Sequence, residues 1–164
     1  MRANKVQRYK PFEEWVWRSY DGRRKINLEE YVRDRRDNNF FFIGTDSRNY
    51  SKKRSCVFTS VLIAYTKEHH GGSAVIHRNV VPFMESLRQR LIMEAMRSLE
   101  VAWWLTKIIP KENVIGIHLD VNQNLKFKSG QYKNELVGLI VSQGFKALVK
   151  PDAWAASCVA DSRT

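Results

Sequence analysis

Two acidic residues follow apolar runs that are typical of buried strands. Asp46 comes after Phe40–Gly44 and one threonine, and Asp120 comes directly after Val114–Leu119. A carboxylate at the end of a central strand is costly to bury unless a partner compensates its charge, and a divalent metal ion is one such partner. An ordinary turn is the alternative, because Asp is a favoured turn residue. Further acids at matching places would favour the metal.

Glu94 is the third acid. Proline at position 82 opens a predicted long helix over residues 82–109. Its apolar residues form one stripe at 100° per residue, and Glu94 lies at the rim of this stripe, whereas Glu100 points nearly the opposite way. Glu94 is thus placed to reach Asp46 under the edge of a sheet. The alternative is a boundary residue paired with Arg90 or Arg97.

Asp152 is the fourth acid, at the start of a predicted helix over Ala153–Ala160. The small side chains of this helix allow it to lie close to a sheet, which would bring Asp152 to the same edge. An acid at this position also stabilises the helix dipole without any further role.

A group of such acids suits phosphodiester hydrolysis. The attacking water and the leaving oxygen must be held in line, and two cations about 3.5–4 Å apart stabilise both. Mg²⁺ and Mn²⁺ are held by carboxylate oxygens, so neither histidine nor cysteine is required. His69, His70 and His77 lack the spacing of zinc motifs, and we interpret them as loop and strand residues.

The rest of the chain predicts the elements that position these acids. Short loops join the first three of five predicted strands into an antiparallel meander, and the long helix then leads to a strand parallel to the first. Asp46 and Asp120 would meet at one edge if their strands are neighbours. The predicted strands are Phe40–Asp46, Cys56–Tyr65, Ser73–Val81, Val114–Leu119 and Phe145–Val149, and a further helix covers Tyr132–Ser142.

Residues 1–38 form a basic and aromatic N-terminal extension that packs on a domain over residues 39–164. Asn27 is a plausible N-cap for a helix through Leu28, Tyr31 and Val32. We favour a helix that covers one edge of the domain, and a contact surface for nucleic acid is the alternative.

The composition favours a polyanionic partner. The chain has 164 residues and a net charge of +11, which points to nucleic acid first and to an anionic membrane surface second. The sequence shows no transmembrane run and no secretory signal, and Cys56 and Cys158 lie far apart, so we expect a reducing cytoplasm. The residues expected to contact nucleic acid are Arg48, Lys52, Lys53, Arg54, Lys126, Lys128 and Lys150.

Four segments in order resemble the YkuK-like family, a domain of unknown function (458) within the ribonuclease H-like superfamily. They are Phe42-Ile43-Gly44-Thr45-Asp46-Ser47, Arg90-Leu91-Ile92-Met93-Glu94-Ala95, Ile117-His118-Leu119-Asp120, and Lys150-Pro151-Asp152 with the residues up to Asp161. The resemblance implies an α/β, ribonuclease H-like fold, with a five-stranded mixed sheet, flanking helices and an N-terminal helical extension.

The resemblance also implies an acidic metal site of the nuclease type. Asp46, Glu94 and Asp120 match the first three acids of the superfamily and Asp152 the fourth, with Asp161 as the alternative to Asp152. We expect Asp46 and Asp120 to hold Mg²⁺ or Mn²⁺, Glu94 to bind a second ion or its water, and the fourth acid to complete the site. The expected activity is a metal-dependent nuclease acting on RNA, DNA or hybrid. The alternatives are a non-catalytic nucleic-acid-binding module of the same fold and a metal-dependent phosphatase or nucleotidase on small substrates.

Overall fold

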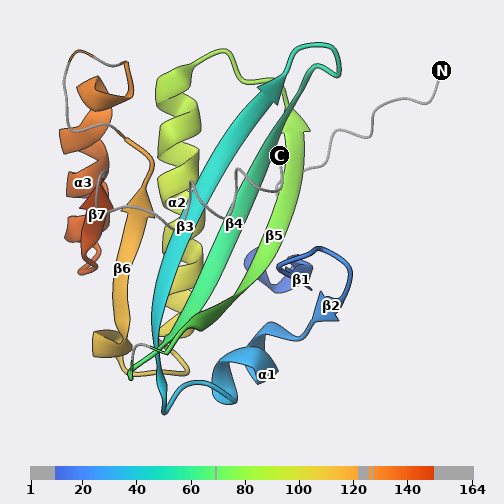
Figure 1. Cartoon of the computed structure of the whole chain (residues 1–164). Coiled ribbons are helices and arrows are strands. Elements are labelled where there is room, and N and C mark those ends of the chain that lie inside the picture. The colour runs from blue at the N-terminus through green and yellow to red at the C-terminus, as the bar shows by residue number, and fades with distance from the viewer. Residues whose placement is uncertain (1–9, 69, 122–125, 127, 150–164) are drawn as a thin grey trace.

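The computed structural model describes residues 10–68, 70–121, 126 and 128–149 of the chain. The described elements form a seven-stranded mixed sheet in the order β2-β1-β5-β4-β3-β6-β7 (Figure 1). Three long strands make its centre: β3 (Asn39–Tyr50), β4 (Ser55–Thr66) and β5 (Gly72–Pro82). They pair antiparallel in chain order, which confirms the predicted meander.

The second half of the sheet is parallel, as predicted. Strand β6 (Val114–Leu119) pairs parallel with β3, and β7 (Ala147–Val149) pairs parallel with β6. Helix α2 (Leu87–Leu105) connects β5 to β6, and α3 (Lys133–Ser142) connects β6 to β7. The mixed α/β architecture with flanking helices is therefore confirmed.

The predicted number of five strands is wrong, because the N-terminal segment adds two strands to the sheet. Strands β1 (Trp17–Ser19) and β2 (Lys25–Ile26) form a hairpin, and β1 pairs antiparallel with β5. The turn between them contains Gly22 at a φ of 76°, a conformation that glycine adopts without strain. Runs of two or three residues are too short for the alternation of apolar and polar residues to reveal a strand.

The helix predicted at Asn27 is present as α1 (Leu28–Arg33). The Asn27 side chain accepts a hydrogen bond from the backbone N–H of Glu30 at 3.1 Å, which is the expected N-cap. A short 3-10 helix, η1 (Phe12–Glu14), precedes β1, and two more, η2 (Lys111–Asn113) and η3 (Ser129–Tyr132), precede β6 and α3. No helix among the described residues is long and apolar enough to cross a membrane.

Several predicted boundaries differ from the structure: the long helix ends at Leu105 and not at residue 109, and the last strand begins at Ala147 and not at Phe145. The first strand does not stop near Asp46 but continues to Tyr50, because pairing with β4 satisfies its backbone on one side, and the basic loop shrinks to a turn over residues 51–54. The long helix begins at Leu87, not at Pro82, which closes β5. Ser86 is its N-cap and accepts a hydrogen bond from the N–H of Gln89.

The main core lies between the sheet and the two helices α2 and α3 on one of its faces. The predicted stripe of α2 is buried there at Leu91, Ala95, Ser98, Ala102 and Leu105. Leu136 and Ile140 of α3 join the same cluster. The rotation of α2 about its axis is therefore as the helical period predicted, and this rotation decides where Glu94 lies.

Candidate metal centre

The pairing of β3 with β6 brings Asp46 and Asp120 to the same edge of the sheet. The last paired residues are Gly44 and His118, two positions before each acid. Asp46 and Asp120 therefore lie at the same end of these two strands, just beyond the point where their pairing stops. Both acids are partly exposed. The neighbouring, parallel strands on which the sequence prediction depended are thus present.

Both of these acids project from the face of the sheet that is opposite α2. Thr45 and Ser47 contact α2, and side chains alternate along a strand, so Asp46 between them points to the other face. Phe42, four residues earlier on that face, packs edge-on against the His118 ring at 5.3 Å between centroids. Asp120 follows His118 by two residues, and alternation along β6, which ends at Leu119, would place it on the same face.

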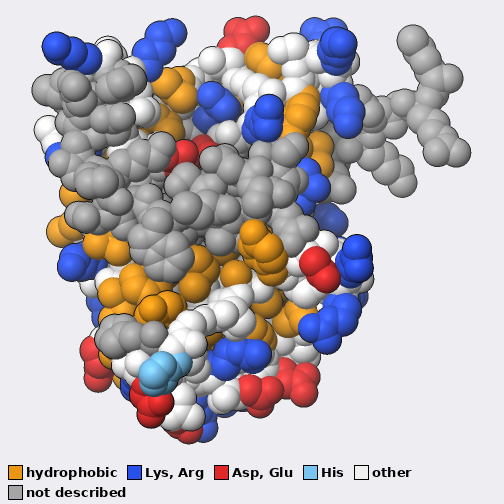
Figure 2. Space-filling model, viewed as in Figure 1, with side chains coloured by type: hydrophobic (Ala, Val, Ile, Leu, Met, Phe, Trp, Pro, Cys, Tyr) orange, Lys and Arg blue, Asp and Glu red, His pale blue; other side chains and the backbone are white. Residues whose placement is uncertain are grey.

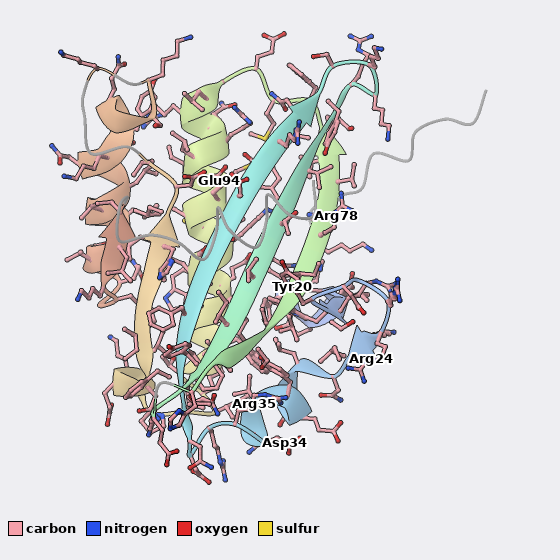
Figure 3. All side chains as sticks on the ribbon, viewed as in Figure 1. Tyr20, Arg24, Asp34, Arg35, Arg78 and Glu94 are labelled. Atoms are coloured by element: carbon pink, nitrogen blue, oxygen red, sulfur yellow. The ribbon has the colours of Figure 1, made fainter. Side chains whose placement is uncertain are left out.

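Glu94 projects from α2, which covers the face of the sheet opposite to that of Asp46. The residue is 7% exposed, and its Oε1 accepts a hydrogen bond from the Ser47 hydroxyl at 2.5 Å. Figure 3 shows Glu94 on the side of α2 that faces β3, beyond the upper end of β6. Beyond Gly44, β3 no longer has β6 as its neighbour, and this open edge is where an acid from α2 and acids from the opposite face can approach one another.

The electrostatics of Glu94 link the three acids. Burial raises the pKa of the Glu94 carboxyl well above its usual value, and the Asp46 carboxylate raises it further. The Ser47 hydrogen bond opposes this rise, Asp120 adds to it, and Arg90 opposes it weakly. A buried acid beside two like charges is the arrangement that a cation stabilises. The donors are carboxylate oxygens, which are the ligand type that Mg²⁺ and Mn²⁺ prefer.

The side chains do not converge on one point. Among residues 10–68, 70–121, 126 and 128–149, no group of three or more His, Cys, Asp or Glu side chains is arranged so as to hold a metal ion. Asp46 projects from one face of the sheet and Glu94 approaches from the other, which explains why the two carboxylates do not converge. The fourth acid, Asp152, its alternative Asp161, and Lys150 lie outside the described residues, so their roles stay predictions.

The histidines take structural positions where they are described. His77 lies in β5, stacks on Trp15 at 4.5 Å between ring centroids, and its Nδ1 lies 2.9 Å from the Val16 carbonyl oxygen. Burial lowers the pKa of His77 to about 4, and burial alone does the same for His118, so both rings are neutral at pH 7. His70 is an exposed bend residue.

Basic side chains surround the end of the sheet that carries the acids. Figure 2 shows Lys and Arg over the β3–β4 turn and near the start of α3. Every described member of the predicted nucleic-acid-binding set is exposed, namely Arg48, Lys52, Lys53, Arg54, Lys126 and Lys128.

Two polar residues near the acids were not predicted from the sequence. Ser47 orients Glu94, and alternation along β3 from the buried Ile43 and Thr45 could have shown that Ser47 faces the helix. Arg78 is an exposed residue of β5. It is paired with Thr59 of β4, and Thr59 is paired with Asp46 of β3, so the side chains of Arg78 and Asp46 project from the same face of the sheet, two strands apart. At the spacing of paired strands this is roughly 10 Å between backbones.

The comparisons with known proteins agree with this architecture. A family model described as ribonuclease H-like matches residues 25–164. No curated protein and no solved structure matches the chain significantly. The matched range includes Asp46, Glu94, Asp120 and the two acids beyond the described residues.

Proposed function

Because the chain belongs to the ribonuclease H-like family, we propose that it is a divalent-metal-dependent nuclease that hydrolyses phosphodiester bonds of nucleic acid. The observation that carries the proposal is the buried Glu94 carboxyl, whose pKa is raised by burial first and then by the nearby Asp46 and Asp120, where β3 and β6 part. A buried acid kept beside two others destabilises the folded chain at neutral pH unless a cation is bound. We expect a protein to retain such a destabilising group of acids where the acids bind a metal ion that it needs for its function.

Asp46, Glu94 and Asp120 would hold the metal ion, with Asp152 or Asp161 as the fourth acid. When bound, the ion supplies the positive charge that stabilises the attacking and leaving oxygens of a phosphodiester. Ser47 holds the Glu94 carboxylate by donating its hydroxyl proton, so this acid keeps one orientation. Hard oxygen ligands select Mg²⁺ or Mn²⁺ over softer metals.

The basic side chains would hold the phosphate backbone. Arg48 and the residues at 52–54 lie at or beyond the end of β3, a few residues from Asp46 along the chain. Arg78 on β5 lies on the same face of the sheet as Asp46, two strands away. Such contacts release counterions and carry little sequence preference, so RNA, DNA and hybrid are all candidate substrates.

A non-catalytic nucleic-acid-binding module is the second candidate. Within the described part of the chain no three acids are arranged to hold a metal ion, and this supports a protein that keeps the fold and the basic surface without cleavage. The two candidates differ in what Mg²⁺ changes. A nuclease needs it for product formation, whereas a binding module binds nucleic acid equally in EDTA.

The deciding experiment is incubation of the full chain with labelled RNA, DNA and hybrid substrates in Mg²⁺, Mn²⁺ or EDTA. We expect cleavage with either metal and none in EDTA. Glu94→Gln should abolish it and Glu100→Gln, on the same helix, should retain it. Binding without cleavage of any polymer would favour the second candidate, and hydrolysis of only mononucleotides or small phosphate esters would favour a phosphatase.

A further inference from the structure

A second site lies at the far end of the sheet from the acids. A cleft of about 740 Å³ is bordered by the β1–β2 hairpin, α1 and the adjoining ends of β4 and β5. Tyr65 in its wall pairs with Phe40, six residues before Asp46, so the cleft lies roughly 20 Å from the acids along the strand. Its volume is within the range of sites for small ligands.

The floor and walls of the cleft are apolar and aromatic. Ile63 and Ala74 line it from the two long strands, and Tyr20, Tyr31 and Tyr65 add three rings. The Tyr31 hydroxyl lies 2.6 Å from the Ser73 hydroxyl, which fixes that ring as part of the wall. Tyr20 is 42% exposed, so a ligand can cover it.

Gly72 shapes the same wall. A Cβ atom at this position would lie 3.2 Å from Cδ2 of Tyr65 and 2.6 Å from the carbonyl oxygen of Ala64. The absence of a side chain therefore lets the Tyr65 ring lie directly against β5. A flat aromatic surface is the feature on which a planar ring system stacks.

The cleft lining carries two arginines, Arg24 and Arg35, and one acid, Asp21, so its charge is net positive. The guanidinium of Arg35 lies over the Tyr31 ring at 4.0 Å, and its Nη1 donates to the Tyr31 carbonyl at 3.1 Å. Arg24 is exposed, and its backbone N–H and carbonyl are both hydrogen-bonded to Ser19, which fixes the hairpin end that carries it. The ion pairs found among the described residues engage neither arginine. Figure 3 shows Tyr20, Arg24 and Arg35 around the first half of β5, next to α1 and β2.

We infer that this cleft binds a nucleotide, with its base against Tyr20 and Tyr65 and its phosphate at Arg24 and Arg35. Stacking surfaces combined with guanidinium groups are the chemistry by which proteins hold single nucleotides, because every base has a π-face and every phosphate a negative charge. An apolar floor alone would suit many ligands, and arginine alone would suit any anion. The ligand is either a free mononucleotide or one nucleotide of a strand.

The test is a binding titration of the full chain in EDTA, where no cleavage occurs, so its outcome is independent of the nuclease proposal. The probes are the four ribonucleoside 5′-monophosphates, adenosine, inorganic phosphate and a 12-nucleotide RNA, measured by calorimetry. We expect saturable binding of the monophosphates, at least tenfold tighter than that of adenosine or phosphate. If the RNA binds tenfold tighter than the monophosphates and depends on the same residues, the ligand is a nucleotide of a strand; otherwise it is the free nucleotide.

The variants are chosen on and beside the cleft. Tyr20→Ala and Arg24→Ala should each weaken nucleotide binding about tenfold, whereas Tyr20→Phe keeps the ring and should bind like the wild type. Arg23→Ala is the matched control, because Arg23 is an exposed arginine of the same turn outside the cleft lining. Thermal melting verifies that each variant is folded. Nucleotide binding that is absent, or unaffected by Tyr20→Ala and Arg24→Ala, would overturn the inference.

Discussion

Replacing Glu94 by glutamine separates a metal site from a structural acid. Glutamine keeps the shape of the side chain and can still accept the Ser47 hydrogen bond, but it carries no charge. Because burial and two neighbouring acids raise the pKa of Glu94, the folded state loses stability as the pH rises from the usual value of 4.5 to the raised pKa. In EDTA at pH 8 we therefore expect the variant to melt at a higher temperature than the wild type.

Metal should reverse this order. A cation at a hundredfold excess over its Kd stabilises the folded wild type by about 2.7 kcal/mol. For a chain of this length, each kcal/mol corresponds to about 2–4 °C, so Mn²⁺ should raise the melting temperature by roughly 5–11 °C. The variant should lose most of this gain, since it lacks one of three carboxylates.

Calorimetric or fluorescence melting of both proteins, with EDTA and with a Mn²⁺ series, measures both effects. Glu100→Gln is the matched control, as it removes a partly buried carboxylate six residues further along the same helix. Its cleavage rate should change less than about threefold, under 0.7 kcal/mol of barrier. Equal metal-induced shifts in wild type and Glu94→Gln would refute the reasoning, and the site would have to be rebuilt around another acid.

Three further predictions concern the surroundings of the site. Ser47→Ala removes the hydrogen bond that opposes the rise in the pKa of Glu94, so Mn²⁺ should bind about tenfold more weakly in the melting assay. Changing the three basic residues at 52–54 to alanine should flatten the salt dependence of single-stranded RNA binding in EDTA, by roughly 0.7 in slope for each phosphate that is no longer neutralised; an unchanged slope would exclude this turn from the interface. His77 has a pKa lowered to about 4 by burial, with Arg97 and Lys10 adding to the shift and the Val16 carbonyl opposing it. The free energy of unfolding that depends on the neutral His77 ring is therefore complete above pH 6.5 and falls as the pH drops toward 4. Between pH 7.5 and 5 the fall is about 2 kcal/mol. In a pH series of melts, His77→Gln should not show this fall in stability.

The sequence contained enough to predict which strands are neighbours, because handedness and crossover rules leave few arrangements. A strand reached through a long helix pairs parallel, and this rule correctly predicts that β6 lies beside β3 and parallel to it. The period of α2 likewise places Glu94 on the buried face. Both predictions rest on patterns longer than five residues, in which a single exception does not change the outcome.

The sequence did not predict where β3 ends or from which faces the acids approach. The end of β3 depends on pairing with β4 through Tyr50↔Ser55, which is a tertiary contact. Counting residues from the buried Phe41 and Ile43 would have placed Asp46 on the face opposite α2, but this requires knowing that the strand continues past Gly44. The strands β1 and β2 escaped prediction because two or three residues carry no period.

The position of Glu94 is fixed by buried hydroxyl groups one turn further along α2. The Ser98 hydroxyl lies 2.9 Å from the Thr45 hydroxyl, which lies 3.0 Å from that of Ser60, so α2, β3 and β4 are joined by one chain of hydrogen bonds. Any rotation of α2 would break this chain and leave buried hydroxyl groups without partners, at about 1–3 kcal/mol each. Ser47 adds the second point of attachment at Glu94 itself. Since two points on one helix fix its rotation, Glu94 is held beside Ser47 of β3, where β3 no longer pairs with β6.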